Sequence, residues 1–125
     1  MQSQSKHFVQ IYKGEYTKAI NRPSGCNGFD IVIGNPPYIS APAQIANEKL
    51  AEQRERLKAC KRYQTLHQKW DLYVPFMEMG LKMLCKNGAF AMIVPFPLSN
   101  QLYGMKFRKW VTENYNVQEI SDILI

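Results

Sequence analysis

The chain has 125 residues, of which 46% are hydrophobic and 21% charged, so length and composition fit one small globular domain. Its formal charge of +6 is compatible with a polyanionic partner but is weak evidence for one. Three distant cysteines argue against a zinc site or a disulfide framework and favour free thiols in the reducing cytoplasm, and no stretch is long and apolar enough to cross a membrane.

The organised part of the chain is predicted to begin at residue 28. Residues 1–27 give no clear element and are predicted to be a leader that ends in a loop. Residues 29–34 are typical of a buried strand in a parallel sheet, because their centre is the β-branched run Ile31, Val32 and Ile33.

The four residues Asn35-Pro36-Pro37-Tyr38 follow this strand directly. The two prolines restrict the backbone to a stiff, extended path just beyond the strand's carboxyl end, where open α/β sheets bind ligands. The Asn35 side chain and the Pro36 carbonyl offer two acceptors for the hydrogens of an amino group. The Tyr38 ring offers a surface for stacking a flipped-out base. The alternative is an ordinary proline-rich turn.

A polar helix is predicted over residues 43–62, after a loop at residues 39–42. Only a thin apolar stripe runs along it, so most of its surface is expected to face solvent. Its basic end consists of Lys58, Lys61 and Arg62. These residues could contact phosphate if the helix covers the site, whereas the simpler interpretation is a solvated face.

Helices and strands alternate in the rest of the chain. Asp71 is the predicted N-cap of a largely buried helix that ends near Lys86, before a stop at Asn87-Gly88. The later elements are a strand at residues 89–94, a helix with an apolar stripe at residues 103–111 that is broken at Asn114 to Asn116, and a third strand at 117–125, where a helix also fits. This order predicts an α/β fold with a mostly parallel sheet and flanking helices.

Residues 29–38 resemble the catalytic motif of amino-methyltransferases that use S-adenosylmethionine, and most closely that of adenine-N6 DNA methyltransferases from restriction–modification systems. Asp71-Leu72-Tyr73 with Phe76, and then residues 88–95, are similar to the two motifs that follow in that family. Tyr103-Gly104 with Arg108 resembles the next helix in fused restriction–methylase proteins. The resemblance covers residues 28–125 and implies a partial Rossmann-like methyltransferase fold.

This resemblance implies methyl transfer from S-adenosylmethionine to the amino group of a flipped-out adenine in double-stranded DNA, without a metal. Asn35, Pro36, Pro37 and Tyr38 would form the catalytic segment. Asn35 and Phe76 would also contact the cofactor, although spacing alone makes Phe76 a core aromatic.

The sequence also departs from the family pattern. No glycine loop for the cofactor precedes residue 29, and the second aromatic that sandwiches the base normally lies beyond position 125. We therefore expect residues 28–125 to be the catalytic half of a larger methyltransferase domain. Alone, the chain is expected to bind the cofactor weakly, to be inactive, and to self-associate through exposed strand edges.

Two other functions stay open. The four-residue motif also occurs in methyltransferases that act on release-factor glutamine or on ribosomal RNA. A non-catalytic α/β module that binds nucleic acid or a protein partner is the third hypothesis.

Overall fold

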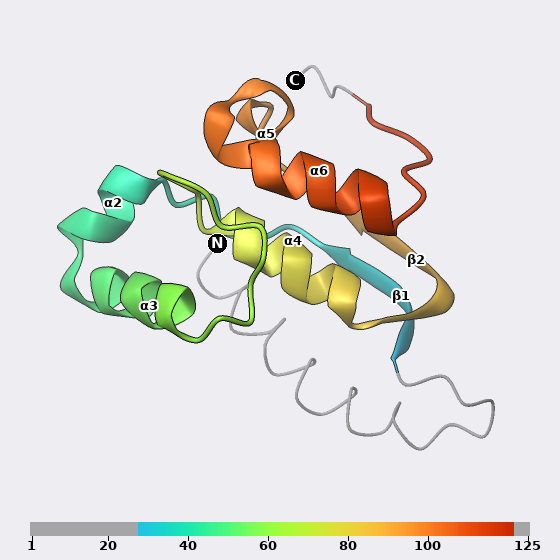
Figure 1. Cartoon of the computed structure of the whole chain (residues 1–125), viewed down its shortest axis with the longest axis horizontal. Coiled ribbons are helices and arrows are strands. Elements are labelled where there is room, and N and C mark those ends of the chain that lie inside the picture. Colours follow the sequence, from blue (N-terminus) through green and yellow to red (C-terminus); the bar gives the residue numbers. More distant parts are fainter. Residues whose placement is uncertain (1–27, 122–125) are drawn as a thin grey trace. The chain divides into compact units, whose positions relative to one another are not determined.

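The structure is a computed structural model that describes residues 28–121, and these form two compact units (Figure 1). The described part of the first unit is residues 28–37 and 76–93. That of the second unit is residues 38–75 and 94–121. The predicted leader, residues 1–27, and the last four residues lie outside the described part.

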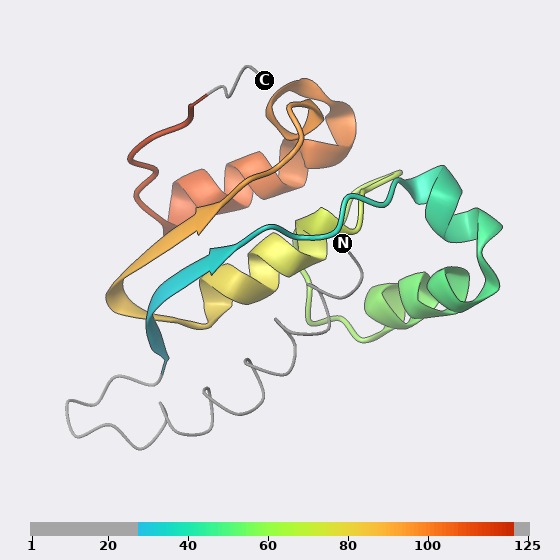
Figure 2. The same ribbon diagram turned by 180° about the vertical axis from the view of Figure 1, so that it is seen from behind.

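The first unit is a two-stranded parallel sheet with a helix on one face. Strand β1 (Phe29–Gly34) pairs with strand β2 (Leu84–Met92), and helix α4 (Tyr73–Lys82) runs beside them in both views (Figures 1 and 2). Helix α4 packs tightly against the sheet at Gly80, because a Cβ built there would lie 2.9 Å from the Phe90 ring and 3.4 Å from Val32. This face holds the core of the first unit. The bounds of β1 confirm the predicted strand at residues 29–34.

Along β1 and β2, the opposite face of the sheet carries exposed side chains. Ile31 and Ile33 pair in register with Ala89 and Ala91, and all four side chains are exposed. Parallel partners in register point to the same side of the sheet, so these residues form one continuous apolar surface. We call Ile31, Ile33, Ala89 and Ala91 the open sheet face.

The connection from α4 to β2 differs from the prediction. Helix α4 ends at Lys82 and not near Lys86, and Asn87-Gly88 lies inside β2. The pairing passes from Phe29↔Leu84 to Ile31↔Ala89, so β2 carries extra residues there. Asn87 has a φ of 66°, and the turn-forming pair therefore serves a bulge in the strand, where the sequence suggested the end of a helix.

The second unit is helical. It contains α2 (Ala41–Ala46), α3 (Glu48–Ala59), α5 (Pro97–Asn100), the short 3₁₀ helix η1 (Leu102–Gly104) and α6 (Met105–Asn114). The Ser40 side chain caps α2, and the Asn47 side chain accepts a hydrogen bond of 3.1 Å from the Leu50 N–H at the start of α3.

The single helix predicted over residues 43–62 is therefore wrong in its bounds. A helix already begins at Ala41, the chain breaks at the Asn47 cap, and α3 stops at Ala59. The predicted strand at 117–125 is also wrong over its described part, because residues 117–121 form neither strand nor helix. The predicted end of the preceding helix is confirmed, since α6 stops at Asn114.

The two-stranded parallel sheet and its helices are compatible with part of a methyltransferase fold. Within residues 28–121, no helix is long and apolar enough to span a membrane, and no cluster of His, Cys, Asp and Glu side chains could hold a metal ion. Cys60 is an exposed free thiol, whereas Cys85 is disulfide-bonded, so the expectation of free thiols is wrong for Cys85.

Candidate active site

The segment Asn35-Pro36-Pro37-Tyr38 leaves the carboxyl end of β1, as predicted. The Gly34 carbonyl still belongs to the sheet edge and accepts a hydrogen bond of 3.3 Å from the Ile93 N–H. Asn35 is then exposed, both prolines are buried, and Tyr38 is half-buried. The boundary between the two compact units falls after Pro37. The segment thus presents a polar side chain to solvent from a backbone that two buried prolines restrict.

The Tyr38 ring rests against a second tyrosine. Tyr73, the first residue of α4, is fully buried, and the centroid of its ring lies 6.2 Å from that of Tyr38 at an interplanar angle of 86°. This edge-to-face geometry is a favoured one for aromatic pairs. Tyr73 belongs to the Asp71-Leu72-Tyr73 segment, so the structure brings together two of the segments that the sequence singled out.

The hydroxyl of Tyr73 belongs to a short chain of hydrogen bonds. It lies 2.7 Å from the Tyr103 hydroxyl, which donates to Oδ2 of Asp71 at 3.3 Å. Because a hydroxyl has only one hydrogen, Tyr73 must donate to Tyr103 when Tyr103 donates to Asp71. Tyr73, Tyr103 and Asp71, which we call the tyrosine relay, therefore run from the ring beside Tyr38 to a carboxyl group.

Burial governs the protonation of the tyrosine relay. It raises the pKa of Tyr73 and of Tyr103 above the ordinary tyrosine value, so both remain hydroxyl donors at neutral pH. Burial also raises the pKa of the Asp71 carboxyl. Hydrogen bonds from Tyr103 and from the backbone of Ala41, and the charge of Arg54, oppose that rise.

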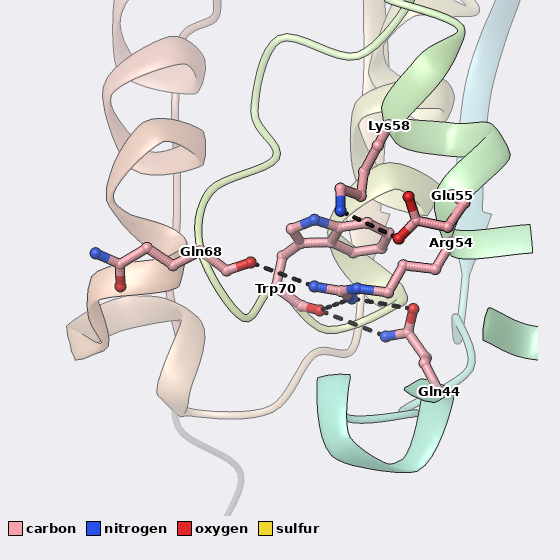
Figure 3. Close-up of polar contacts among 6 residues, drawn as sticks. All are labelled: Gln44, Arg54, Glu55, Lys58, Gln68 and Trp70. Carbon is pink, nitrogen blue, oxygen red and sulfur yellow. Dashed lines mark hydrogen bonds and ion pairs between the residues drawn. The ribbon is translucent and has the colours of Figure 1, made fainter. Parts of the chain in front are cut away.

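A buried polar cluster holds the backbone just after Tyr38 (Figure 3). The Ile39 carbonyl accepts hydrogen bonds from the Leu72 N–H at 3.0 Å and from Nε2 of Gln44 at 2.9 Å. Gln44 Nε2 also donates to the Trp70 carbonyl at 3.4 Å, and its Oε1 accepts from Arg54 at 3.2 Å. The chain just after Tyr38 is thereby tied to residues 70–72 within the second unit.

Arg54 is the centre of this cluster. Its guanidinium donates to the Trp70 carbonyl at 2.8 Å and to the Gln68 carbonyl at 3.2 Å, and it stacks 3.9 Å from the centroid of the Trp70 ring (Figure 3). The side chain is buried although it lies on a helix of largely solvated residues. Three acceptors and one aromatic face satisfy it, which is the arrangement a buried arginine needs.

The other predicted site residues are one aromatic residue and three cations. Phe76 is a half-buried residue of α4 in the first unit. Lys58, Lys61 and Arg62 are exposed at and beyond the carboxyl end of α3, where Lys58 pairs with Glu55 at 3.1 Å. Their proposed contacts with cofactor and DNA stay predictions.

Three residues of this site had no role in the sequence prediction. Gln44 and Arg54 fell within one long, mostly solvated predicted helix. Tyr103 was assigned to an apolar stripe and to a segment that resembles the family, without a partner. The cap at Asn47 is the local signal that could have separated α2 from α3. No pattern in the sequence indicates that Arg54 stacks on Trp70, because this contact joins residues 16 positions apart.

Known proteins are similar to this chain over most of its length. A family model described as "Eco57I restriction-modification methylase" matches residues 2–124. Over 95 residues the chain is 37% identical to the type II methyltransferase M.BstVI of Geobacillus stearothermophilus, and over 96 residues it is 34% identical to M.PaeR7I of Pseudomonas aeruginosa. It is 28% identical over 86 residues to RM.Eco57I of Escherichia coli, a type II restriction enzyme and methyltransferase.

These matches cover most of this chain but little of each relative. They take in 76%, 77% and 69% of the chain, which spans 16% of the length of M.BstVI and of M.PaeR7I and 8% of RM.Eco57I. No solved structure matches. Because the family model covers nearly all 125 residues, the expected family is confirmed, and the chain belongs to the Eco57I restriction-modification methylases.

Proposed function

We propose that this chain carries the catalytic segment of a DNA methyltransferase that methylates the exocyclic amino group of adenine. The observation that supports this most directly is the exposed Asn35 at the end of β1, three residues before a tyrosine ring that packs edge-on against Tyr73. Consecutive residues thus supply an amide oxygen, the Pro36 carbonyl and an aromatic surface. Those groups suit a flat ring that carries an amine.

In this mechanism Asn35 and the Pro36 carbonyl accept the two hydrogens of the adenine amino group. An aromatic amine is a poor nucleophile because its lone pair is delocalised into the ring. Two accepted hydrogen bonds draw the nitrogen toward a tetrahedral geometry and localise that lone pair. Tyr38 stacks on the flipped base and holds the nitrogen in place. No general base is needed beforehand, since the nitrogen becomes acidic as it gains the methyl group.

S-adenosylmethionine would supply the methyl group when bound. Of the residues in this chain, we assign Asn35 and Phe76 to it, because Phe76 is a half-exposed aromatic that can pack on a flat ring. The sequence has no glycine loop for the remainder of the cofactor. We therefore infer that the 125-residue chain alone binds S-adenosylmethionine weakly and does not methylate DNA. Micromolar binding in calorimetry would contradict this inference.

Double-stranded DNA is the proposed substrate, and the cytoplasm is the proposed place of reaction. The relatives are named as type II methyltransferases, and one also as a restriction enzyme, which favours DNA over a glutamine or ribosomal RNA substrate. Lys58, Lys61 and Arg62 are exposed cations that could contact phosphate. The Cys85 disulfide gives no support to a reducing compartment, so the placement depends on the DNA substrate alone.

Methylation by the full-length protein tests this proposal. With tritiated S-adenosylmethionine and unmethylated genomic DNA, Asn35→Ala should lower the rate on the order of a hundredfold or more, because it removes one of the two acceptors for the target amino group. Tyr38→Ala should lose stacking of about 1–3 kcal/mol, and Tyr38→Phe should be mild because the ring is kept.

Asn116→Ala, at an exposed asparagine in the second unit, is the matched control and should methylate normally. Digestion of the product should yield N6-methyladenine, and ribosomal RNA or release factor offered in place of DNA should remain unlabelled. Normal methylation by Asn35→Ala, or label only in RNA or protein, would show that the proposed function is wrong.

A further inference from the structure

The Tyr38 ring packs edge-to-face against another aromatic ring. Its edge-to-face neighbour is Tyr73, a fully buried ring whose own position is fixed at the hydroxyl end by the tyrosine relay. A stacking surface is useful only at the correct tilt, because a base held by two hydrogen bonds on one side has little freedom to follow a rotated ring. The contacts that fix the Tyr73 ring should therefore affect how Tyr38 stacks on the base.

The tyrosine relay connects η1 with the residues around the start of α4. Tyr103 lies on η1, 30 residues beyond Tyr73, and its ring also meets the Tyr73 ring edge-on, with centroids 6.4 Å apart at 71°. Asp71 accepts from Tyr103 and also from the backbone N–H of Ala41, three residues after Tyr38. One carboxyl group thus joins the start of α2, the start of α4 and η1 around the Tyr73 ring, all inside the second unit.

We propose that Tyr73, Tyr103 and Asp71 are positioning residues that set the plane of the Tyr38 ring for stacking on the target base. This inference rests on the proposed function of Tyr38. The hydroxyl of Tyr103 is the decisive group, because it is both acceptor from Tyr73 and donor to Asp71. Its loss breaks two hydrogen bonds in the relay and leaves every aromatic ring in place.

The test is a double-mutant cycle in the full-length protein, with methylation of unmethylated genomic DNA as the readout. Tyr103→Phe should lower kcat by roughly fivefold to tenfold, the change that corresponds to the net loss of about one hydrogen bond. KM for S-adenosylmethionine should not change. In a Tyr38→Ala background the same substitution should have almost no further effect, because no ring remains to be positioned.

A purely structural role of the hydroxyl would give another pattern. The two substitutions would then be additive, and Tyr103→Phe would be equally harmful with or without the Tyr38 ring. Tyr115→Phe is the matched control, because Tyr115 makes a similar edge-on contact with Trp110, at 5.3 Å and 62°, away from the relay. It should leave kcat unchanged.

The outcomes separate this inference from the proposed function. Normal methylation by Tyr38→Ala would overturn the proposed function itself. A damaged Tyr38→Ala protein with a normal or additive Tyr103→Phe would overturn the positioning role alone. Tyr103→Phe that fails to fold would show as a lowered Tm. Asp71→Ala, which removes the acceptor of the Tyr103 hydroxyl, then serves as the second variant, and it should lower kcat several-fold when Tyr38 is present but not in the Tyr38→Ala background.

Discussion

Asp71 is the residue of the site whose ionisation should change stability between acid and neutral pH. Burial raises the pKa of its carboxyl, so the folded protein holds this proton more tightly than the unfolded chain does. Stability should therefore fall as the pH rises from about 4 through the raised pKa. Asp71→Asn removes this titration. At neutral pH the variant should be better protected from hydrogen exchange than the wild type, and at acid pH the two proteins should differ little.

Hydrogen exchange of the peptide covering α4, compared between the two proteins at equal pH, measures this difference. Glu113→Gln, at an exposed carboxyl on α6, is the control. Its α4 peptide should be protected to the same degree as that of the wild type across the pH range. Wild-type protein that gains protection over Asp71→Asn as the pH rises would mean that the hydrogen bonds to Asp71 outweigh its burial.

At the level of single residues, local chemistry was predictable and distant pairing was not. Asn35 to Tyr38 could be located from the β-branched run before them, and β1 ends where that run predicts. Asp71 was predicted as an N-cap, yet its carboxyl group accepts from Tyr103, 32 residues away. A side chain with several potential partners bonds to the one that the fold brings near. The sequence around Asp71 does not indicate that this partner is Tyr103.

At the scale of elements, Arg54 holds α3 against residues 68–70. Arg54→Met keeps the apolar stem but leaves the carbonyls of Gln68 and Trp70 without this donor, so α3 should lose roughly 2–4 kcal/mol of stability. Arg54→Lys should recover little, since an ammonium group has neither the planar fork nor the stacking face. Hydrogen exchange of residues 48–59 measures the free energy of opening.

Arg56→Met is the control for this prediction. Arg56 lies on the same helix and pairs with Glu52, but both side chains are exposed. Such a pair contributes about 0.5 kcal/mol or less, so its loss should scarcely change exchange in α3. Equal effects of the two substitutions would mean that the buried cluster does not anchor the helix.

The elements predicted correctly are those with a strong local pattern. The strand at residues 29–34 and the end of α6 follow from β-branched residues and an asparagine-rich break. The boundaries that failed are set by single side chains or by pairing: the Asn47 cap divides one predicted helix, and register with β1 draws Asn87-Gly88 into a strand. Turn-forming residues indicate an irregularity in the chain, but they do not distinguish the end of a helix from a bulge in a strand.

At the scale of the molecule, the first unit buries one face of a sheet and exposes the other. Among the described residues of this unit, two strands and one helix form a small core, and sheets of this size usually need a further layer for stability. The sequence predicted a larger, mostly parallel sheet from the α/β order, whereas the described residues form two parallel strands. The continuous apolar run of β1 is typical of a strand that is buried on both faces. We therefore expect the open sheet face to be covered in the full-length protein.

We therefore expect the 125-residue chain to self-associate through the open sheet face. Ile31 and Ile33 are 63% and 69% exposed, and Ala89 and Ala91 extend their surface across β2. Apolar surface of this kind pairs with a second copy when nothing else covers it. Sedimentation should show a dimer or larger species whose share rises with concentration.

The double substitution Ile31→Thr with Ile33→Thr keeps β-branched side chains while lowering the apolar area, and should shift the protein toward monomer. Ile45→Thr is the matched control, because Ile45 is equally exposed, at 64%, but lies on α2 in the other unit. If the sheet face drives association, this control should sediment like the wild type. Wild-type monomer at high concentration, or equal dissociation by the control, would mean that the open sheet face does not hold the copies together.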